Sequence, residues 1–120
     1  MLRSSIAVIF LALYILLVGP PLILHCLVTG SPEAMFKVAV AGARFAMVIC
    51  GIKVKVEGRE NIPPGVCIFV ANHTSNADPP AVVGSIPRRV ALLGKKEAFR
   101  VPILGTVLKL SGFVPVDRAN

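Results

Sequence analysis

No Asp, Glu, Lys or Arg occurs between Arg3 and Glu33, and most side chains in this stretch are apolar. The stretch is longer than the roughly 20 apolar residues that cross a bilayer as a helix. Two helical runs, Ile6–Val18 and Leu22–Val28, flank a Gly-Pro-Pro sequence at 19–21, where proline breaks or kinks a helix. The pattern predicts a hydrophobic membrane anchor that is either one kinked span or a re-entrant bend.

A secretory signal peptide begins in a similar way, with a basic residue before an apolar run. Here no small-x-small cleavage site follows the run, and apolar character resumes up to Val28. We therefore expect a retained anchor rather than a cleaved signal.

A second apolar helix is expected to follow, with Ser31 as its N-cap and the next residue, a proline, at its first position. The run Ala34–Cys50 is almost wholly apolar, and Glu33, Lys37 and Arg44 are spaced by four and seven residues. This spacing puts the three charges on one stripe. It predicts a helix at the membrane interface or packed beside the first helix, with the following residues on the cytoplasmic side.

The pattern changes after residue 50, so we divide the chain into a membrane-associated helical segment, 1–50, and the N-terminal part of a catalytic domain, 51–120. The run at 53–57 alternates with a period of two, and the run at 66–71 is continuously apolar, as in a strand buried on both faces. Strands that alternate with helices imply an α/β fold with a mainly parallel sheet. The expected strands are Lys53–Glu57, Val66–Ala71, Arg89–Leu93 and Phe113–Val116, and the expected helices are Pro79–Ser85 and Pro102–Leu110.

The charge is strongly basic, with 13 Lys and Arg against 6 Asp and Glu, which gives a net charge of +7. A basic domain beside a hydrophobic anchor suits membrane lipid with an anionic surface, or phosphate-bearing substrates. The sequence has no nucleic-acid-binding motif and no aromatic residues interleaved with the basic ones, so we expect no nucleic-acid partner.

The three cysteines, Cys26, Cys50 and Cys67, are widely spaced and form no C-x-x-C pair. We therefore expect no structural metal site. Each lies in an apolar pattern, which favours buried small side chains in a reducing, cytosol-facing domain.

His73 and Asp78 are the strongest candidates for catalysis. Imidazole is the side chain best suited to accept a proton near neutral pH, and a carboxylate on its other nitrogen fixes the tautomer. Five residues along a regular helix turn through about 500°, which leaves the two side chains about 140° apart. They can pair only across a turn, which Pro79 favours by steering Asp78 away from helical dihedrals.

This turn would place the pair at the carboxyl end of a strand and at a helix N-terminus, where α/β sheets bind ligands. The structural alternative is that Asp78 is only an N-cap and His73 a loop residue bound to backbone. Ser75 has no G-x-S-x-G frame that would indicate a serine nucleophile.

A second candidate group follows the later strands. Arg118, just past the last strand, is placed to grip a phosphate with its planar guanidinium, and Asp117 is placed to orient it. The Lys-Lys-Glu sequence at 95–97 also follows a strand, and one of its lysines can point at the same anion. The simpler interpretation of Asp117 and Arg118 is a surface salt bridge, and that of residues 95–97 is a solvated turn.

Three sequence blocks resemble those of the glycerolipid acyltransferases. Residues 72–78 match N-H-x-x-x-x-D, residues 94–97 are similar to (A/G)-K-(K/R)-E, and residues 112–118 are similar to G-x-(I/V)-P-(V/I)-D-R. Their order and separation, after an apolar helical segment, resemble the bacterial 1-acyl-sn-glycerol-3-phosphate acyltransferases.

The resemblance implies that His73 is the general base, that Asp78 orients it, and that Arg118 and Lys95 hold the acceptor phosphate. The acceptor would be lysophosphatidic acid, the product phosphatidic acid, and acyl-CoA or acyl-carrier protein the co-substrate, with no other cofactor. The expected location is a bacterial cytoplasmic membrane, with the catalytic part facing the cytoplasm.

The family's third block, E-G-T-R, does not occur in the 120 residues, and we expect a fragment of a longer enzyme. Two alternatives to this function stay open. One is acyl transfer to another lysophospholipid or to dihydroxyacetone phosphate. The other is a non-catalytic module that binds anionic membranes.

Overall fold

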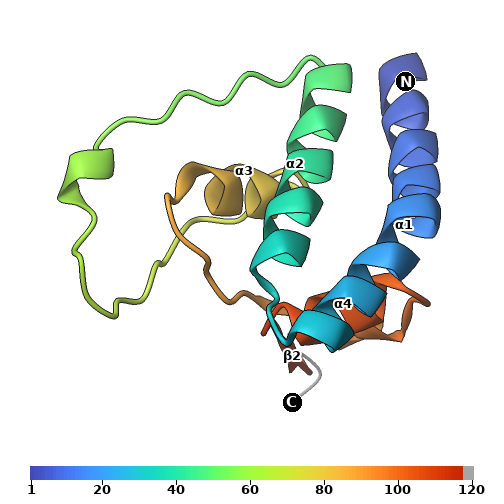
Figure 1. The fold of residues 1–120 in the computed structure, drawn as a ribbon. Coiled ribbons are helices and arrows are strands. Elements are labelled where there is room, and N and C mark those ends of the chain that lie inside the picture. The colour runs from blue at the N-terminus through green and yellow to red at the C-terminus, as the bar shows by residue number, and fades with distance from the viewer. Residues whose placement is uncertain (118–120) are drawn as a thin grey trace.

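The apolar N-terminal stretch forms one long helix, α1 (Leu2–Thr29), in the computed structural model, which describes residues 1–117. The helix runs through Pro20 and Pro21 and is visibly bent near its middle (Figure 1). The bend fits the backbone hydrogen bonds that two prolines remove. The predicted interruption at 19–21 is therefore a bend within one helix and not a break.

By length and composition, α1 could cross a membrane, and only 11 % of its most apolar window is buried within the protein. It ends at Gly30, whose φ of 67° is left-handed and whose N–H donates to the carbonyl of Cys26. Signal sequences pass the same test of length and composition. The structure alone therefore gives limited support to a membrane anchor.

The second helix, α2 (Glu33–Ile49), returns antiparallel to α1 and packs along it (Figure 1). Tyr14 Oη donates a hydrogen bond of 2.8 Å to the carbonyl of Val38, and its ring covers Gly42, where a Cβ would overlap it. The rings of Phe10 and Phe45 add a contact of 5.1 Å between centroids. The predicted packing of the two helices side by side is confirmed.

The start of α2 differs by one residue from the prediction. Pro32, not Ser31, occupies the N-cap position, and no side chain caps the helix there. The predicted stripe of charges is present, because Lys37 Nζ pairs with Glu33 Oε1 at 3.3 Å across one helical turn.

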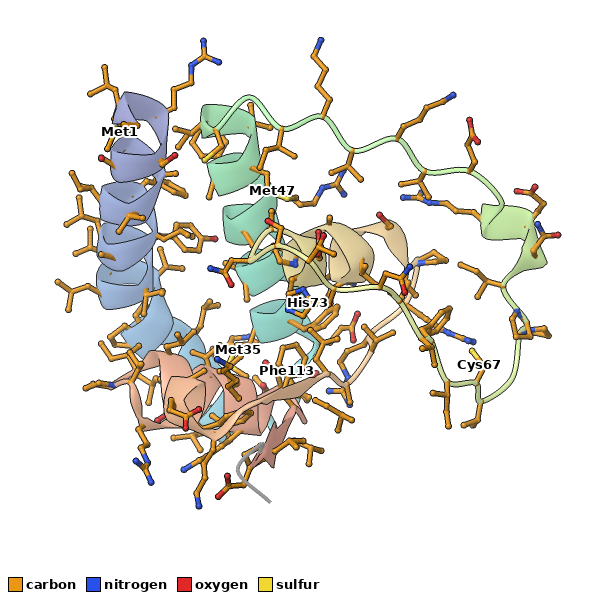
Figure 2. The ribbon with its side chains drawn as sticks, turned by 180° about the vertical axis from the view of Figure 1, so that it is seen from behind. Met1, Met35, Met47, Cys67, His73 and Phe113 are labelled. Atoms are coloured by element: carbon orange, nitrogen blue, oxygen red, sulfur yellow. The ribbon has the colours of Figure 1, made fainter. Side chains whose placement is uncertain are left out.

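The rest of the described chain adds short elements below and beside this hairpin. They are η1 (Arg59–Asn61), α3 (Asp78–Ser85), β1 (Leu93–Lys95), η2 (Lys96–Arg100), α4 (Leu104–Leu110) and β2 (Val114–Val116). The helix α3 packs on α2 through the buried Val83, and α4 packs on α1, where Ile103 contacts Gly19. Met35 is completely buried, and Phe36 meets Phe113 edge-on at 6.5 Å (Figure 2).

The sheet has two parallel strands in the described residues, with Leu93 opposite Val114 and Lys95 opposite Val116. Gly112, with a φ of 83°, ends α4 and turns the chain into β2. The predicted helix at 102–110, the last strand and the parallel pairing are therefore confirmed, with α4 beginning two residues late.

Three other predicted strands are wrong as stated. The segments 53–57 and 66–71 are extended but unpaired, and the strand expected at 89–93 lies at Leu93–Lys95 instead. Within residues 1–117 the ladder joins β1 to β2 alone, and a strand exists only where a neighbour accepts its backbone hydrogen bonds. The apolar side chains at 66, 68 and 70 are 106 %, 90 % and 92 % exposed, so this segment is not the doubly buried strand that its composition suggested.

The prediction that the cysteine side chains are buried is confirmed for one cysteine of the three. Cys26 is buried, whereas Cys50 and Cys67 are partly exposed, and all three are free thiols. Cys67 lies on the outlying segment that leaves the helical body (Figure 2).

Candidate active site

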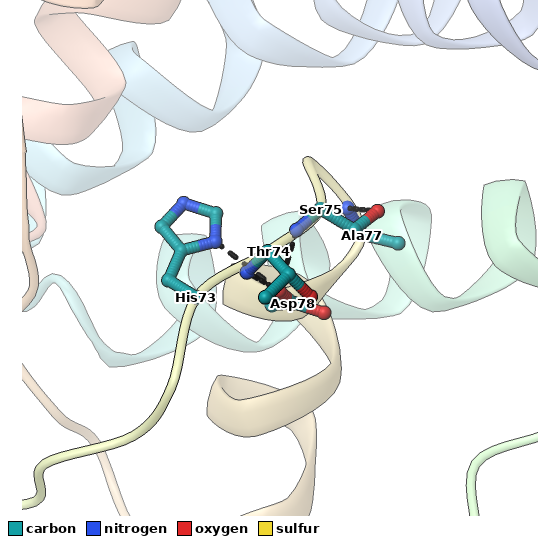
Figure 3. A network of polar contacts seen from close by, with 5 residues as sticks. All are labelled: His73, Thr74, Ser75, Ala77 and Asp78. Carbon is teal, nitrogen blue, oxygen red and sulfur yellow. Dashed lines mark hydrogen bonds and ion pairs between the residues drawn. The ribbon is translucent and has the colours of Figure 1, made fainter.

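The side chains of His73 and Asp78 meet across a tight turn at the start of α3. Oδ2 of Asp78 lies 3.2 Å from Nδ1 of His73 (Figure 3). The N–H of Asp78 donates to the carbonyl of Ser75 at 3.1 Å, which closes the turn. The geometric prediction that the two side chains reach hydrogen-bonding range, about 2.6–3.2 Å, is confirmed.

The same carboxylate oxygen is held by the backbone. The N–H groups of Thr74 and Ser75 each donate to Asp78 Oδ2 at 2.7 Å (Figure 3). The hydrogen bond from Ser75, then that from Thr74, and then that from His73 lower the pKa of Asp78 below its usual value. Asp78 is therefore an ionised acceptor at neutral pH.

An ionised carboxylate can only accept hydrogen bonds, so the hydrogen between it and the imidazole belongs to Nδ1 of His73. In the neutral ring this leaves the lone pair on Nε2. The His73 side chain is 46 % exposed, and a solute can reach it from solvent. The arrangement can accept a proton at Nε2 and stabilise the resulting imidazolium through Asp78.

Two details of the predicted setting are corrected. Asp78 is the first residue of α3 and not its N-cap, which is Ala77. Its carboxylate bonds backward to the turn instead of forward to the helix, because the turn at 74–75 offers two N–H groups. His73 follows an extended, unpaired segment and not a strand, so the position at a strand's carboxyl end is not present among residues 1–117.

Lys95 lies at the carboxyl end of β1, opposite Val116 of the parallel β2, and is exposed. Its neighbour Lys96 forms an ion pair, in which Lys96 Nζ lies 3.3 Å from Asp117 Oδ2. Asp117, which the sequence placed beside the arginine, thus contacts a lysine of the second candidate group. The two groups meet because parallel strands end at the same edge of a sheet.

Two of the predicted relationships are not seen in the structure. Arg118 lies outside the described residues. Among residues 1–117, no hydrogen bond or ion pair joins Lys95 to His73 or Asp78. The catalytic and phosphate-binding roles of these four residues stay predictions.

Sequence reasoning missed the two backbone amides that fix Asp78. The short polar run between the histidine and the aspartate was the available signal, because such residues favour side-chain-to-backbone turns. It also missed Arg88, whose guanidinium donates to the carbonyl of Pro64 at 3.1 Å and to Cys67 Sγ at 2.8 Å. The Arg88 guanidinium also makes a cation–π contact with the Phe69 ring, at 5.9 Å from its centroid. These contacts stabilise the position of the segment that leads to His73. No local pattern predicts this long-range contact.

Comparison with known proteins shows the family of this chain. The model of the Acyltransferase family matches residues 53–120, which is more than half of the chain and includes the His73–Asp78 turn. The chain belongs to this family.

A curated relative gives a more specific similarity. The chain is 32 % identical over 72 residues to a 1-acyl-sn-glycerol-3-phosphate acyltransferase of Limnanthes douglasii. The match covers 60 % of this chain and 25 % of that protein, so the chain spans about a quarter of its relative's length. No solved structure matches.

Proposed function

We propose that this chain carries the proton-transfer pair of an enzyme that moves a fatty acyl group to the free hydroxyl of 1-acyl-sn-glycerol-3-phosphate. The product is phosphatidic acid, and acyl-CoA or acyl-carrier protein donates the acyl group. The observation that most supports the proposal is the 3.2 Å contact between His73 and Asp78, which leaves Nε2 of an exposed ring as the base. The printed name of the relative supports the choice of acceptor.

The proposed reaction needs one base and no metal or redox cofactor. Nε2 of His73 takes the proton of the acceptor hydroxyl as that oxygen attacks the thioester carbonyl. The tetrahedral intermediate then expels the thiolate, which receives the proton from the imidazolium. One ester bond forms, one thioester bond breaks, and Asp78 stabilises the imidazolium throughout.

Lys95 and Arg118 are the proposed ligands of the acceptor phosphate. Lys95 is an exposed cation at the end of β1, and in the sequence Arg118 comes two residues after β2. Arginine and lysine both bind phosphate through charge-assisted hydrogen bonds, arginine with a two-pronged geometry.

We further propose that α1 holds the enzyme on a cytoplasmic membrane, with the catalytic part facing the cytoplasm. The support is the length, composition and exposure of α1 and the basic residues that follow the hairpin. A lipid acceptor and an enzyme held at the bilayer would meet without transfer of the acceptor through water.

The test is His73→Ala in the protein expressed from its full gene. We expect acyl transfer from labelled acyl-CoA to 1-acyl-glycerol-3-phosphate to be lost, while the protein stays in the membrane fraction. His25→Ala, a change to an exposed histidine of α1, is the matched control and should transfer normally. Normal transfer by His73→Ala would rule out the assigned base, and a lack of transfer by the unchanged protein would favour a non-catalytic membrane-binding module. Other lysophospholipids assayed in parallel decide the acceptor.

A further inference from the structure

An open, mostly apolar groove of about 510 Å³ runs along one side of α2. This volume lies within the range of ligand pockets, about 300–1,000 Å³. Most of the lining residues belong to α2, and Ile52 and Val54 belong to the segment that leaves α2 toward η1. The lining residues are Lys37, Val40, Ala41, Arg44, Phe45, Met47, Val48, Ile52 and Val54.

The groove has a basic end. A small notch of about 30 Å³ adjoins it, and the two hollows share Arg44, Met47 and Val54. The notch is also lined by Arg59 of η1, so two arginines from distant parts of the chain converge there. No acidic side chain lines either hollow.

Arg44 is held in place by α3. Its Nη1 donates to the carbonyl of Gly84 at 3.4 Å, and its Cδ lies where it would be 3.0 Å from a Cβ at Gly84. Within residues 1–117, neither Arg44 nor Arg59 forms an ion pair with a carboxylate. The two guanidinium groups are thus placed for an anion that the described part of the chain does not supply.

The groove is continuous with the apolar surface of α1. Phe45 lines the groove, is 55 % exposed, and contacts Phe10 of α1. A bilayer that takes up the exposed apolar side chains of α1 would therefore place lipid tails at the mouth of the groove. This continuity favours a membrane lipid over a soluble ligand as the occupant.

We infer that the α2 groove is a binding site for an anionic phospholipid of the membrane, separate from the acceptor site at His73. The acyl chain lies along Ala41, Phe45 and Val48, and the phosphate contacts Arg44 and Arg59. The inference rests on the proposed membrane association of α1 but not on acyl transfer.

These 120 residues contain no tryptophan, so an indole introduced into them can report on one position. Val48→Trp places the reporter in the groove, and Leu16→Trp places one on the exposed side of α1. Each variant is reconstituted into two series of phosphatidylcholine vesicles, which contain increasing mole fractions of either brominated phosphatidylglycerol or brominated phosphatidylcholine. Bromine quenches indole fluorescence only at close range.

We expect the Val48→Trp variant to be quenched at about tenfold lower content of the anionic lipid than of the neutral lipid, as one charge-assisted hydrogen bond allows. Adding Arg44→Gln or Arg59→Gln should abolish this preference. Adding Arg89→Gln, a change to an exposed arginine outside both hollows, should leave it intact. The Leu16→Trp variant should be quenched equally by both lipids.

Equal quenching of Val48→Trp by the two lipids, or a preference that survives both arginine substitutions, would overturn the inference. So would a Val48→Trp reporter that stays unquenched while Leu16→Trp is quenched, because the groove would then exclude lipid. An unquenched Leu16→Trp would overturn the membrane association itself. The proposed acyl transfer is measured separately with His73→Ala, and its failure would leave this lipid-binding result unaffected.

Discussion

His73 Nδ1 makes the longest of the three hydrogen bonds that Asp78 Oδ2 accepts, at 3.2 Å against 2.7 Å for each backbone amide. The carboxylate is therefore fixed by the turn itself, and the imidazole docks on an acceptor that is already in place. The position of the Asp78 carboxylate therefore does not depend on the contact with His73.

Asp78→Asn should lower kcat for acyl transfer by about 10²–10⁴-fold, the usual value of positioned acid–base catalysis. The neutral amide no longer stabilises an imidazolium and no longer requires the hydrogen to be on Nδ1. The KM of the acceptor should change little. Steady-state kinetics on membranes check this, with Ser75→Ala as the control because it removes only the hydrogen bond from the amide of Ala77 to Ser75 Oγ. A kcat equal to that of the unchanged protein would remove Asp78 from the mechanism.

The contribution of Asp78 to stability should depend on pH in one direction. Its pKa is lowered in the folded state, so the stabilisation is complete above the unfolded value, about 3.9, and is lost as pH falls through the folded value. The difference in Tm between the unchanged protein and Asp78→Asn should thus be present at neutral pH and shrink below about pH 4. Thermal unfolding in detergent measures it. A difference that grew at acid pH would contradict the assigned sign.

Lys95→Ala should raise the KM for the phosphorylated acceptor by about tenfold, which corresponds to one charge-assisted hydrogen bond. Lys96→Ala is the matched control, since Lys96 is paired with Asp117 and an exposed pair contributes only about 0–1 kcal/mol. Arg118→Ala should resemble Lys95→Ala. An effect confined to the thioester donor would show that these cations serve a different substrate.

Gly42→Ala should destabilise the hairpin of α1 and α2, although alanine is the better helix former by about 1 kcal/mol. The added Cβ overlaps the Tyr14 ring, and overpacking of this kind costs about 1–3 kcal/mol. We expect a lower Tm in detergent for Gly42→Ala, and a smaller loss of Tm when the same change is made in a Tyr14→Ala background, because the smaller side chain makes room. Ala41→Gly, on the exposed stripe of the same helix, reports the effect of helix propensity alone.

The helical parts of the fold were predictable because their signals are local. The apolar stretch, Pro32 before Glu33, and Gly112 after α4 placed three helices to within a few residues. The strands at 53–57 and 66–71 were not predictable in the same way. Their side-chain patterns are typical of strands, but a strand needs a partner, and composition does not say which residues supply it.

The site shows the same division. The sequence by itself identified His73 and Asp78 as the candidate pair and determined that a turn must join them, since a helix would hold them apart. Only the tertiary structure decided how Asp78 is held, through two backbone amides. It also decided that Arg44 of α2 and Arg59 of η1 line the same notch. The reason is physical: hydrogen-bond chemistry is a property of each residue, whereas a shared position in space depends on packing between segments that are far apart in the chain.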